Sequence, residues 1–276
     1  MALGEGWRTR AVRWLRRRLP PPLRRAIEDA SGQDIPLHAA GLAFFALVSL
    51  IPLTIVAMWV ASLVAGEGRV ERLAQALAAI APRNLGADRA LIRVAELGTS
   101  LGVVAIVAAL APATAYGSGL ARAFRRLSPK DPPEELRGVL GRGLLLLVVV
   151  PLFVLGTMLA AFAATSLFEE ALLRALGWVL ALALAFLGGG LAAALIYRVF
   201  PPEALPWRAV LRGAAVSGAG VALLTVAFAA IVGLGADFTK YYAMSGLAGI
   251  VLLATWLFVA NAALLTGYRV ALRAAR

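Results

Sequence analysis

The side chains that could perform acid–base or metal chemistry are few in this chain. It has one histidine, His38, and no cysteine among 276 residues. Its adjacent carboxylates, Glu134 with Glu135 and Glu169 with Glu170, point about 100° apart if they are helical, so neither pair converges on one substrate. A nuclease, which hydrolyses phosphodiesters, needs clustered metal ligands or a matched general acid and base, and this chain offers neither. The sequence therefore predicts a protein that is not an enzyme, and it indicates no cofactor and no metal site.

Polar contact inside apolar segments is the second kind of chemistry that the residues allow. The polar or helix-breaking residues that we select inside these segments are Ser49, Pro52, Tyr116, Ser118 and Asn261. An amide or a freed carbonyl in lipid must find a partner. One hypothesis is that the four polar residues face a shared internal cavity; the alternative is hydrogen bonding between helices. His38 is either a titrating gate at the mouth of the first apolar segment or an interfacial residue that contacts headgroups or a carbonyl.

Long apolar segments must position these residues. The chain is 61% hydrophobic, with a mean hydropathy of +0.85, whereas soluble domains contain about 45–50% apolar residues. About 20 apolar residues cross a bilayer as a helix. We predict an all-α integral membrane protein, a six-transmembrane-helix bundle with short amphipathic surface helices. The predicted spans are residues 37–65, 99–120, 144–165, 178–197, 214–234 and 245–266.

Shorter segments flank this six-span membrane domain, which we assign to residues 37–270. Residues 1–36 form a basic segment, ended by three prolines, that we expect to rest on anionic lipid rather than to bind nucleic acid. Residues 67–97 contain two amphipathic pieces that we expect at the membrane surface or capping the bundle. Residues 271–276 form a short basic tail.

The charge distribution predicts the orientation. If both termini lie on one side, that side collects 20 of the 27 Lys and Arg residues and the whole net charge of +12. Cytoplasmic loops are enriched in Lys and Arg. We therefore expect both termini in the cytoplasm, and a pI that reports topology and lipid contact.

Several motifs suggest a family. The first is the run from Ala39 to Leu53, AAGLAFFALVSLIPL, and further matches are Phe200, Pro201, Pro202, Trp207, Gly213, Tyr242, Gly246, Trp256, Leu265 and Gly267. With these residues the chain resembles the YihY/BrkB membrane proteins, a bacterial six-span family once labelled ribonuclease BN. The resemblance implies a multi-pass protein of the bacterial inner membrane, suspected of transporting lipids or envelope components.

The chain departs from the family pattern at two places. The family often has a tyrosine where this chain has Phe44 or Phe45, so any hydroxyl there is missing. The family usually ends its last span with Gly-Ala-Glu, whereas Gly267 is followed by Tyr268 and Arg269. A role of that acidic residue does not carry over to this chain.

The predicted spans also limit the mechanism. None carries a charged residue, which argues against strong ion coupling. The glycines at 188–190 are no phosphate loop, because no Gly-Lys-Ser/Thr follows, and close helix packing or a hinge explains them. We predict a passive translocator of lipid or another amphipathic envelope component. The alternative is a membrane scaffold that docks an envelope-assembly partner through residues 67–96 or its basic face. The residues leave the substrate and the oligomeric state open.

Overall fold

A computed structural model of the chain describes residues 35–80, 87–100, 103–128, 171–233 and 245–276. In these ranges the chain forms helices and no strand, so the predicted all-helical class is confirmed there. The helices are α3 (Ile35–Ala65), α4 (Glu67–Ile80), α5 (Ala87–Ser100), α6 (Val103–Leu127), α8 (Ala171–Val199), α9 (Trp207–Gly233) and α10 (Ser245–Ala274).

Four helices of the described part are long and apolar enough to cross a membrane. Their candidate spans are Ile35–Val56, Gly177–Val199, Trp207–Ala227 and Ile250–Ala274. They correspond to the first, fourth, fifth and sixth predicted spans. The predicted span 144–165 lies outside the described residues, as do the predicted basic segment up to residue 34 and the carboxylate pairs at 134–135 and 169–170. The six-span count therefore stays a prediction.

The predicted boundaries differ from the observed ones where charged residues flank an apolar run. The predicted second span began at residue 99, but α5 continues to Ser100 and α6 extends from Val103 to Leu127. Likewise α9 begins at Trp207 instead of residue 214, and α10 runs through most of the predicted tail to Ala274. Arginine has a high helix propensity and a long side chain that reaches the interface. A helix therefore need not end where its apolar run ends.

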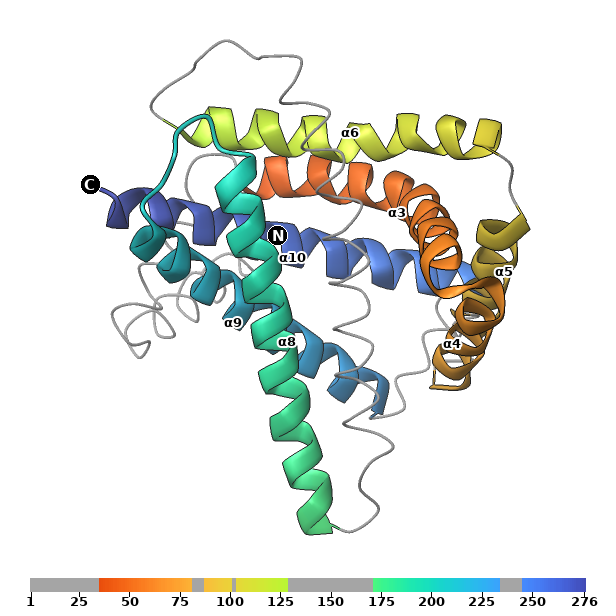
Figure 1. Cartoon of the computed structure of the whole chain (residues 1–276). Coiled ribbons are helices and arrows are strands. Elements are labelled where there is room, and N and C mark those ends of the chain that lie inside the picture. The colour runs from red at the N-terminus through yellow and green to blue at the C-terminus, as the bar shows by residue number, and fades with distance from the viewer. Residues whose placement is uncertain (1–34, 81–86, 101–102, 129–170, 234–244) are drawn as a thin grey trace, which may run out of the picture.

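The helix α3 determines how the rest is arranged. It packs against α6 and α10, α10 packs against α9, and α9 packs against α8 (Figure 1). Pro52 lies inside α3 and lacks the N–H that a helix interior needs, and the hydroxyl of Thr54 bonds the carbonyl of Leu50 at 2.7 Å. Both features favour bending. The second half of α3 turns toward α4 and α5 (Figure 1).

The predicted outer amphipathic segment is a helical hairpin at the end of α3. Gly66 alone separates α3 from α4, at a φ of 87°, which glycine adopts without strain. Its N–H donates to the carbonyl of Ser62 at 2.9 Å. On α4, Val70 and Ala74 are buried whereas Glu71 is exposed, so the helix is amphipathic as expected. The hairpin of α4 and α5 packs on α3.

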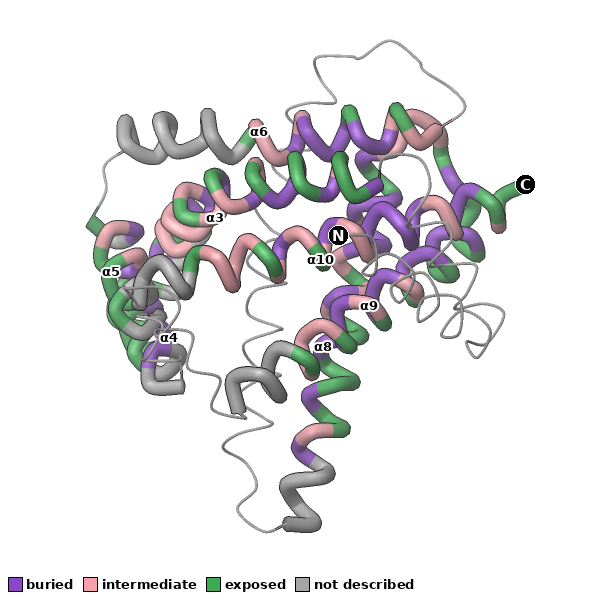
Figure 2. Tube along the Cα trace, turned by 180° about the vertical axis from the view of Figure 1, so that it is seen from behind, coloured by how far each residue is buried: buried purple, intermediate pink, exposed green. Residues whose placement is uncertain are grey.

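The main core lies at one end of the bundle. It joins the start of α3, the end of α6, the end of α8, the start of α9 and the second half of α10. Its largest fully buried side chains are aromatic: Phe124, Tyr197, Phe200 and Tyr268. Buried segments gather toward the end where the C-terminus lies (Figure 2). We call this the basic end, because arginines flank each of these helix termini except the start of α3.

Candidate functional site

The structure brings two of the selected residues together. Tyr116 on α6 donates from its hydroxyl to Asn261 Oδ1 on α10 at 2.9 Å. Asn261 is 4% exposed, and its Nδ2 donates to the carbonyl of Leu257 at 2.8 Å. The amide is thus paired on both its oxygen and its nitrogen. This is the contact that hydrogen bonding between helices predicts.

The other selected residues lie elsewhere. Ser49 is fully buried in the row of α3 that faces the bundle, and Pro52 is half-buried at the bend of the same helix. Ser118 bonds within α6, where its hydroxyl donates to the carbonyl of Ala115 at 2.9 Å. His38 lies in the first turn of α3, at the basic end. The shared polar cavity itself stays a prediction.

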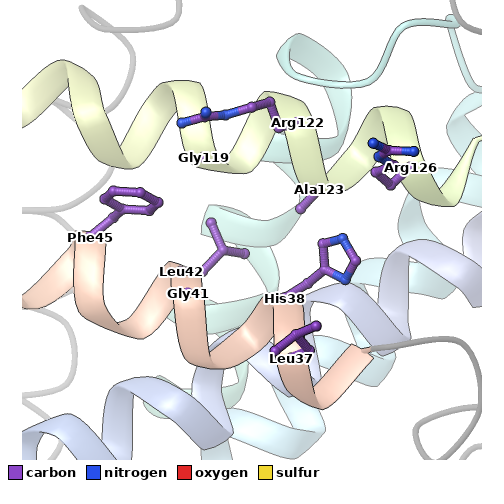
Figure 3. A pocket seen from close by; sticks show the side chains of 9 residues that line it. All are labelled: Leu37, His38, Gly41, Leu42, Phe45, Gly119, Arg122, Ala123 and Arg126. Carbon is purple, nitrogen blue, oxygen red and sulfur yellow. The ribbon is translucent and has the colours of Figure 1, made fainter.

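An open pocket lies between the start of α3 and the second half of α6. Its volume is about 260 Å³. It is lined by Leu37, His38, Gly41, Leu42, Phe45, Gly119, Arg122, Ala123 and Arg126. His38 and Phe45 rise from α3, while Arg122 lies toward the Phe45 end and Arg126 toward the His38 end (Figure 3). We call this the α3–α6 pocket. It combines an apolar floor with a basic rim.

Arg122 is held in place at this rim. Its Nε donates to the carbonyl oxygen of Ser118, and its terminal nitrogen donates to the Ser118 hydroxyl, each at 3.3 Å. Its guanidinium carbon lies 5.9 Å from the centroid of the Phe45 ring, within the range of a cation–π contact. Phe45 thus offers Arg122 an apolar ring without a hydroxyl.

Two glycines shape the α3–α6 pocket in opposite ways. A Cβ on Gly119 would lie 2.9 Å from the Phe45 ring and 3.3 Å from Leu42. Gly119 therefore allows α3 and α6 to approach closely. A Cβ on Gly41 would meet no atom within 4 Å. Gly41 therefore leaves the mouth of the pocket open.

The lining residues of the α3–α6 pocket decide its chemistry. Two arginines and one histidine line it, and none of its nine lining residues is acidic. In the described ranges no three His, Cys, Asp or Glu side chains lie close enough together to hold a metal ion. Guanidinium groups bind phosphate and carboxylate through paired N–H donors. The arrangement suits an anion that is attached to an apolar group.

A second polar cluster closes the crossing of α8, α9 and α10. The Tyr197 hydroxyl and Ser217 Oγ lie 2.6 Å apart, and the Tyr197 hydroxyl also donates to the carbonyl of Leu264. Ser217 in turn donates to the carbonyl of Ala263 at 3.1 Å. Both side chains are at most 1% exposed. The two hydroxyls are therefore paired with carbonyls of α10 and lie against each other, and these contacts link three helices.

Glycines permit this crossing. A Cβ on Gly213 would lie 2.5 Å from the carbonyl oxygen of Gly267, and a Cβ on Gly267 would collide with Ser217 Oγ. Small residues let the backbones of membrane helices touch. We call the contact of Tyr197, Ser217, Gly213 and Gly267 the α8–α10 crossing.

The glycines at 188–190 on α8 have two different surroundings. A Cβ on Gly189 would lie 3.1 Å from Val221, and one on Gly190 would lie 3.6 Å from the carbonyl oxygen of Ala214, so both lie against α9. A Cβ on Gly188 would meet no atom within 4 Å. The expected close packing thus applies to Gly189 and Gly190 only.

The sequence was also compared with models of known protein families. A family model described as virulence factor BrkB matches residues 26–276. The chain belongs to the BrkB family. The resemblance noted in the sequence is confirmed. Neither a curated protein nor a solved structure matches the chain.

The BrkB motif residues contribute to both sites. The first-span motif supplies Gly41, Leu42 and Phe45 to the α3–α6 pocket. Gly213 and Gly267 form the α8–α10 crossing. The motif residues thus mark one closed contact and one open pocket.

Tyr268 marks the second departure from the BrkB pattern. Its hydroxyl lies 2.7 Å from Ser128 Oγ, its ring centroid lies 4.4 Å from that of Phe124, and the residue is fully buried. Tyr268, which follows Gly267, therefore makes an aromatic contact between α10 and the end of α6.

Sequence reasoning missed several of these residues. Arg122 and Arg126 were counted only as topological charges, and Tyr197 and Ser217 were not selected as a pair. The spacing of Gly119, Arg122 and Arg126 places them on one helix face, as it does for His38, Gly41 and Phe45. This signal was present in the sequence. It does not say that the two faces meet.

Proposed function

We propose that this BrkB-family protein is a passive translocator of a lipid or another amphipathic envelope component in the bacterial inner membrane. The observation that supports the proposal is the α3–α6 pocket, whose apolar floor and basic rim adjoin an exposed apolar face of α3. A molecule with a polar head and an apolar chain fits both parts.

The exposed face of α3 continues from the pocket along the helix. Its residues are spaced three or four apart, and they are Leu37, Gly41, Phe44, Val48 and Ile51. Leu37 is 71% exposed and Phe44 is 63% exposed. In a bilayer such a stripe faces acyl chains. We call it the α3 stripe, and in this proposal a lipid chain lies along it.

The proposed orientation rests on the charges at the basic end. The segments that meet there carry a single acidic residue, Glu203, among the described residues. Their arginines are Arg122, Arg125, Arg126, Arg198, Arg208, Arg212, Arg269, Arg273 and Arg276. By the positive-inside rule, we propose that this end, with the pocket, lies at the cytoplasmic leaflet. Trp207, with Arg198 stacked 5.2 Å from its ring centroid, suits the headgroup level there.

A vesicle assay tests the proposal. The purified protein is reconstituted into vesicles that contain labelled lipids, and the exchange of lipid between leaflets is measured against empty vesicles. Mass spectrometry of the lipids retained after mild-detergent purification identifies the substrate class. We expect accelerated exchange. Exchange no faster than in empty vesicles would refute translocation.

A matched pair of glycine variants ties the flux to the pocket. Gly41→Leu places a side chain into the pocket mouth, where a Cβ meets no atom within 4 Å. Gly188→Leu places the same side chain on α8, where a Cβ also meets no atom within 4 Å. We expect Gly41→Leu to lose most of the exchange and Gly188→Leu to keep it. Equal exchange by both would remove the pocket from the pathway.

The hairpin of α4 and α5 favours a second candidate function, a scaffold for an envelope partner. This hairpin carries exposed charges outside the main core, including Glu67, Arg69 and the ion pair of Arg93 with Glu96 at 3.0 Å. Copurification of one stoichiometric partner without lipid movement would favour this candidate. If charge reversal of Arg69 and Arg72, which are both exposed, abolishes this copurification, the docking surface lies on the hairpin.

A further inference from the structure

We infer that the α3–α6 pocket binds the phosphate group of an anionic lipid, with Arg122 and Arg126 as its cationic contacts and the α3 stripe as the surface for its chain. This inference rests on the proposed function and deepens it, because it names the class of substrate and the residues that recognise it.

The charge of the rim selects a phosphate. Arg122 and Arg126 lie one turn apart on α6, both side chains are exposed, and both line the pocket. His38 faces them from α3 (Figure 3). Planar guanidinium groups recognise phosphate through paired donors. A zwitterionic headgroup would add an ammonium group, and none of the nine described residues that line the pocket is a carboxylate that could receive it. The rim therefore favours a headgroup with net negative charge.

Arg122 is pre-oriented for this contact. Ser118 holds two of its N–H donors, and the Phe45 ring lies against its guanidinium. Its other donors remain to meet a ligand. Fixing a side chain before binding lowers the entropy lost on binding. Phe45 and Ser118 are thus positioning residues for Arg122.

The floor of the pocket favours a lipid over a soluble phosphate. Leu37, Leu42 and Phe45 line it, and the ring of Phe45 contacts that of Phe44 on the α3 stripe at a centroid distance of 5.9 Å. The apolar surface is therefore continuous from the pocket to the stripe. A soluble phosphate would leave this surface uncovered, whereas an acyl chain buries it.

A charge-matched pair of double variants tests the inference. Arg122→Gln with Arg126→Gln removes the rim charges. Arg208→Gln with Arg212→Gln removes two exposed arginines at the same spacing on α9, also at the basic end. Both variants lose the same net charge. General attraction of anionic lipid to the basic end changes equally in both.

Binding to the full-length protein in mild detergent is measured by native mass spectrometry. The probes are phosphatidylglycerol, phosphatidylcholine and glycerol phosphate, and thermal unfolding confirms that each variant is folded. We expect phosphatidylglycerol to bind at least about tenfold more tightly than the other two. The rim variant should lose at least about tenfold in affinity for it, since one charge-assisted contact alone is worth about that factor, and the α9 variant less than about twofold.

Three results would overturn the inference. They are equal affinity for phosphatidylglycerol and phosphatidylcholine, equal loss in both double variants, and binding of glycerol phosphate as tight as that of phosphatidylglycerol, which would assign the site to a soluble phosphate.

The exchange assay separates this inference from the proposed function. Selective binding of phosphatidylglycerol that the rim variant loses, without any movement of lipid, supports the site and overturns translocation. Movement of all lipids regardless of charge, unchanged in the rim variant, supports translocation and overturns the site.

Discussion

The α8–α10 crossing and the α3–α6 pocket both contain glycines of the BrkB motifs, but the glycines do opposite things. Gly213 and Gly267 bring two backbones so close that a Cβ on either would collide with the other helix. Gly41 faces open space. At the crossing the missing side chain allows contact, and at the pocket it leaves room.

The polar groups differ in the same way. At the crossing, the hydroxyls of Tyr197 and Ser217 are buried, lie in contact with each other and donate to carbonyls of α10. At the pocket, the side chains of Arg122 and Arg126 are exposed, and the partners of Arg122 are on its own helix or a ring. Buried groups that satisfy one another stabilise a fold, whereas oriented groups at an open rim serve a ligand. The type of a small or polar residue in a membrane helix therefore does not reveal its function. The residues that surround it decide whether it closes a helix contact or lines a site.

The largest effect on stability is expected when a methyl group is added at the α8–α10 crossing. In Gly267→Ala the new Cβ would lie 2.5 Å from the carbonyl oxygen of Gly213 and 2.7 Å from the Tyr197 hydroxyl. Because backbone atoms cannot move aside without separating the helices, we expect the free energy of unfolding to fall by about 3 kcal/mol. Unfolding in mixed micelles measures it, with Gly188→Ala as the control. Equal stability of the two variants would show that the crossing is not tightly packed.

Removing the Tyr197 hydroxyl at the α8–α10 crossing is expected to lower the free energy of unfolding by less than Gly267→Ala does. Tyr197→Phe keeps the ring contacts with Phe124 but leaves the carbonyl of Leu264 without this donor. We expect a loss of about 1–2 kcal/mol in the free energy of unfolding, since the buried contacts of this hydroxyl with Ser217 and with the carbonyl of Leu264 are lost. The same unfolding experiment measures it. A loss below that of an exposed Val179→Ala control would mean that water replaces the hydroxyl.

The hydrogen bond of Tyr116 with Asn261 should contribute less. It is one side-chain hydrogen bond between α6 and α10, and such bonds average about 0.6 kcal/mol in membrane proteins. A double-mutant cycle of Tyr116→Phe and Asn261→Leu isolates the coupling energy. A coupling energy of zero would mean that the pair is not formed. Reaction of a cysteine at either position with a small polar thiol reagent would instead support the predicted cavity.

The smallest effect on stability is expected at the pocket. Gly41→Leu adds a side chain where a Cβ meets no atom, and leucine favours the helix by up to about 1 kcal/mol over glycine. We expect an unchanged or slightly higher thermal midpoint, although lipid exchange falls. A thermal midpoint that stays the same or rises while lipid exchange falls would distinguish the pocket from the crossing, where an added methyl group lowers stability. Marked destabilisation would show that the pocket is closed by other parts of the chain.

Particular residues show how far sequence reasoning reached. The charge-free run that begins at residue 37 predicted α3, because this depends on local composition alone. Pro52, selected as helix-breaking, lies where α3 bends, because proline lacks the N–H that a helix interior needs. The selection of Tyr116 and Asn261 found two partners, since each stood out as polar inside an apolar run. Arg122 did not stand out. An arginine at the end of a span looks like any topological charge until Phe45 lies under it.

The sequence by itself determined the class of fold. Apolar runs of this length must cross or line a membrane, and a backbone in lipid must bond within its own helix, so both properties follow from each segment alone. Only the tertiary structure decided that Gly267 closes a crossing while Gly41 opens a pocket, and that Arg122 belongs to a site. The physical reason is that these roles depend on which helix faces meet. That choice follows from the packing of all the helices together and is not encoded in any one of them.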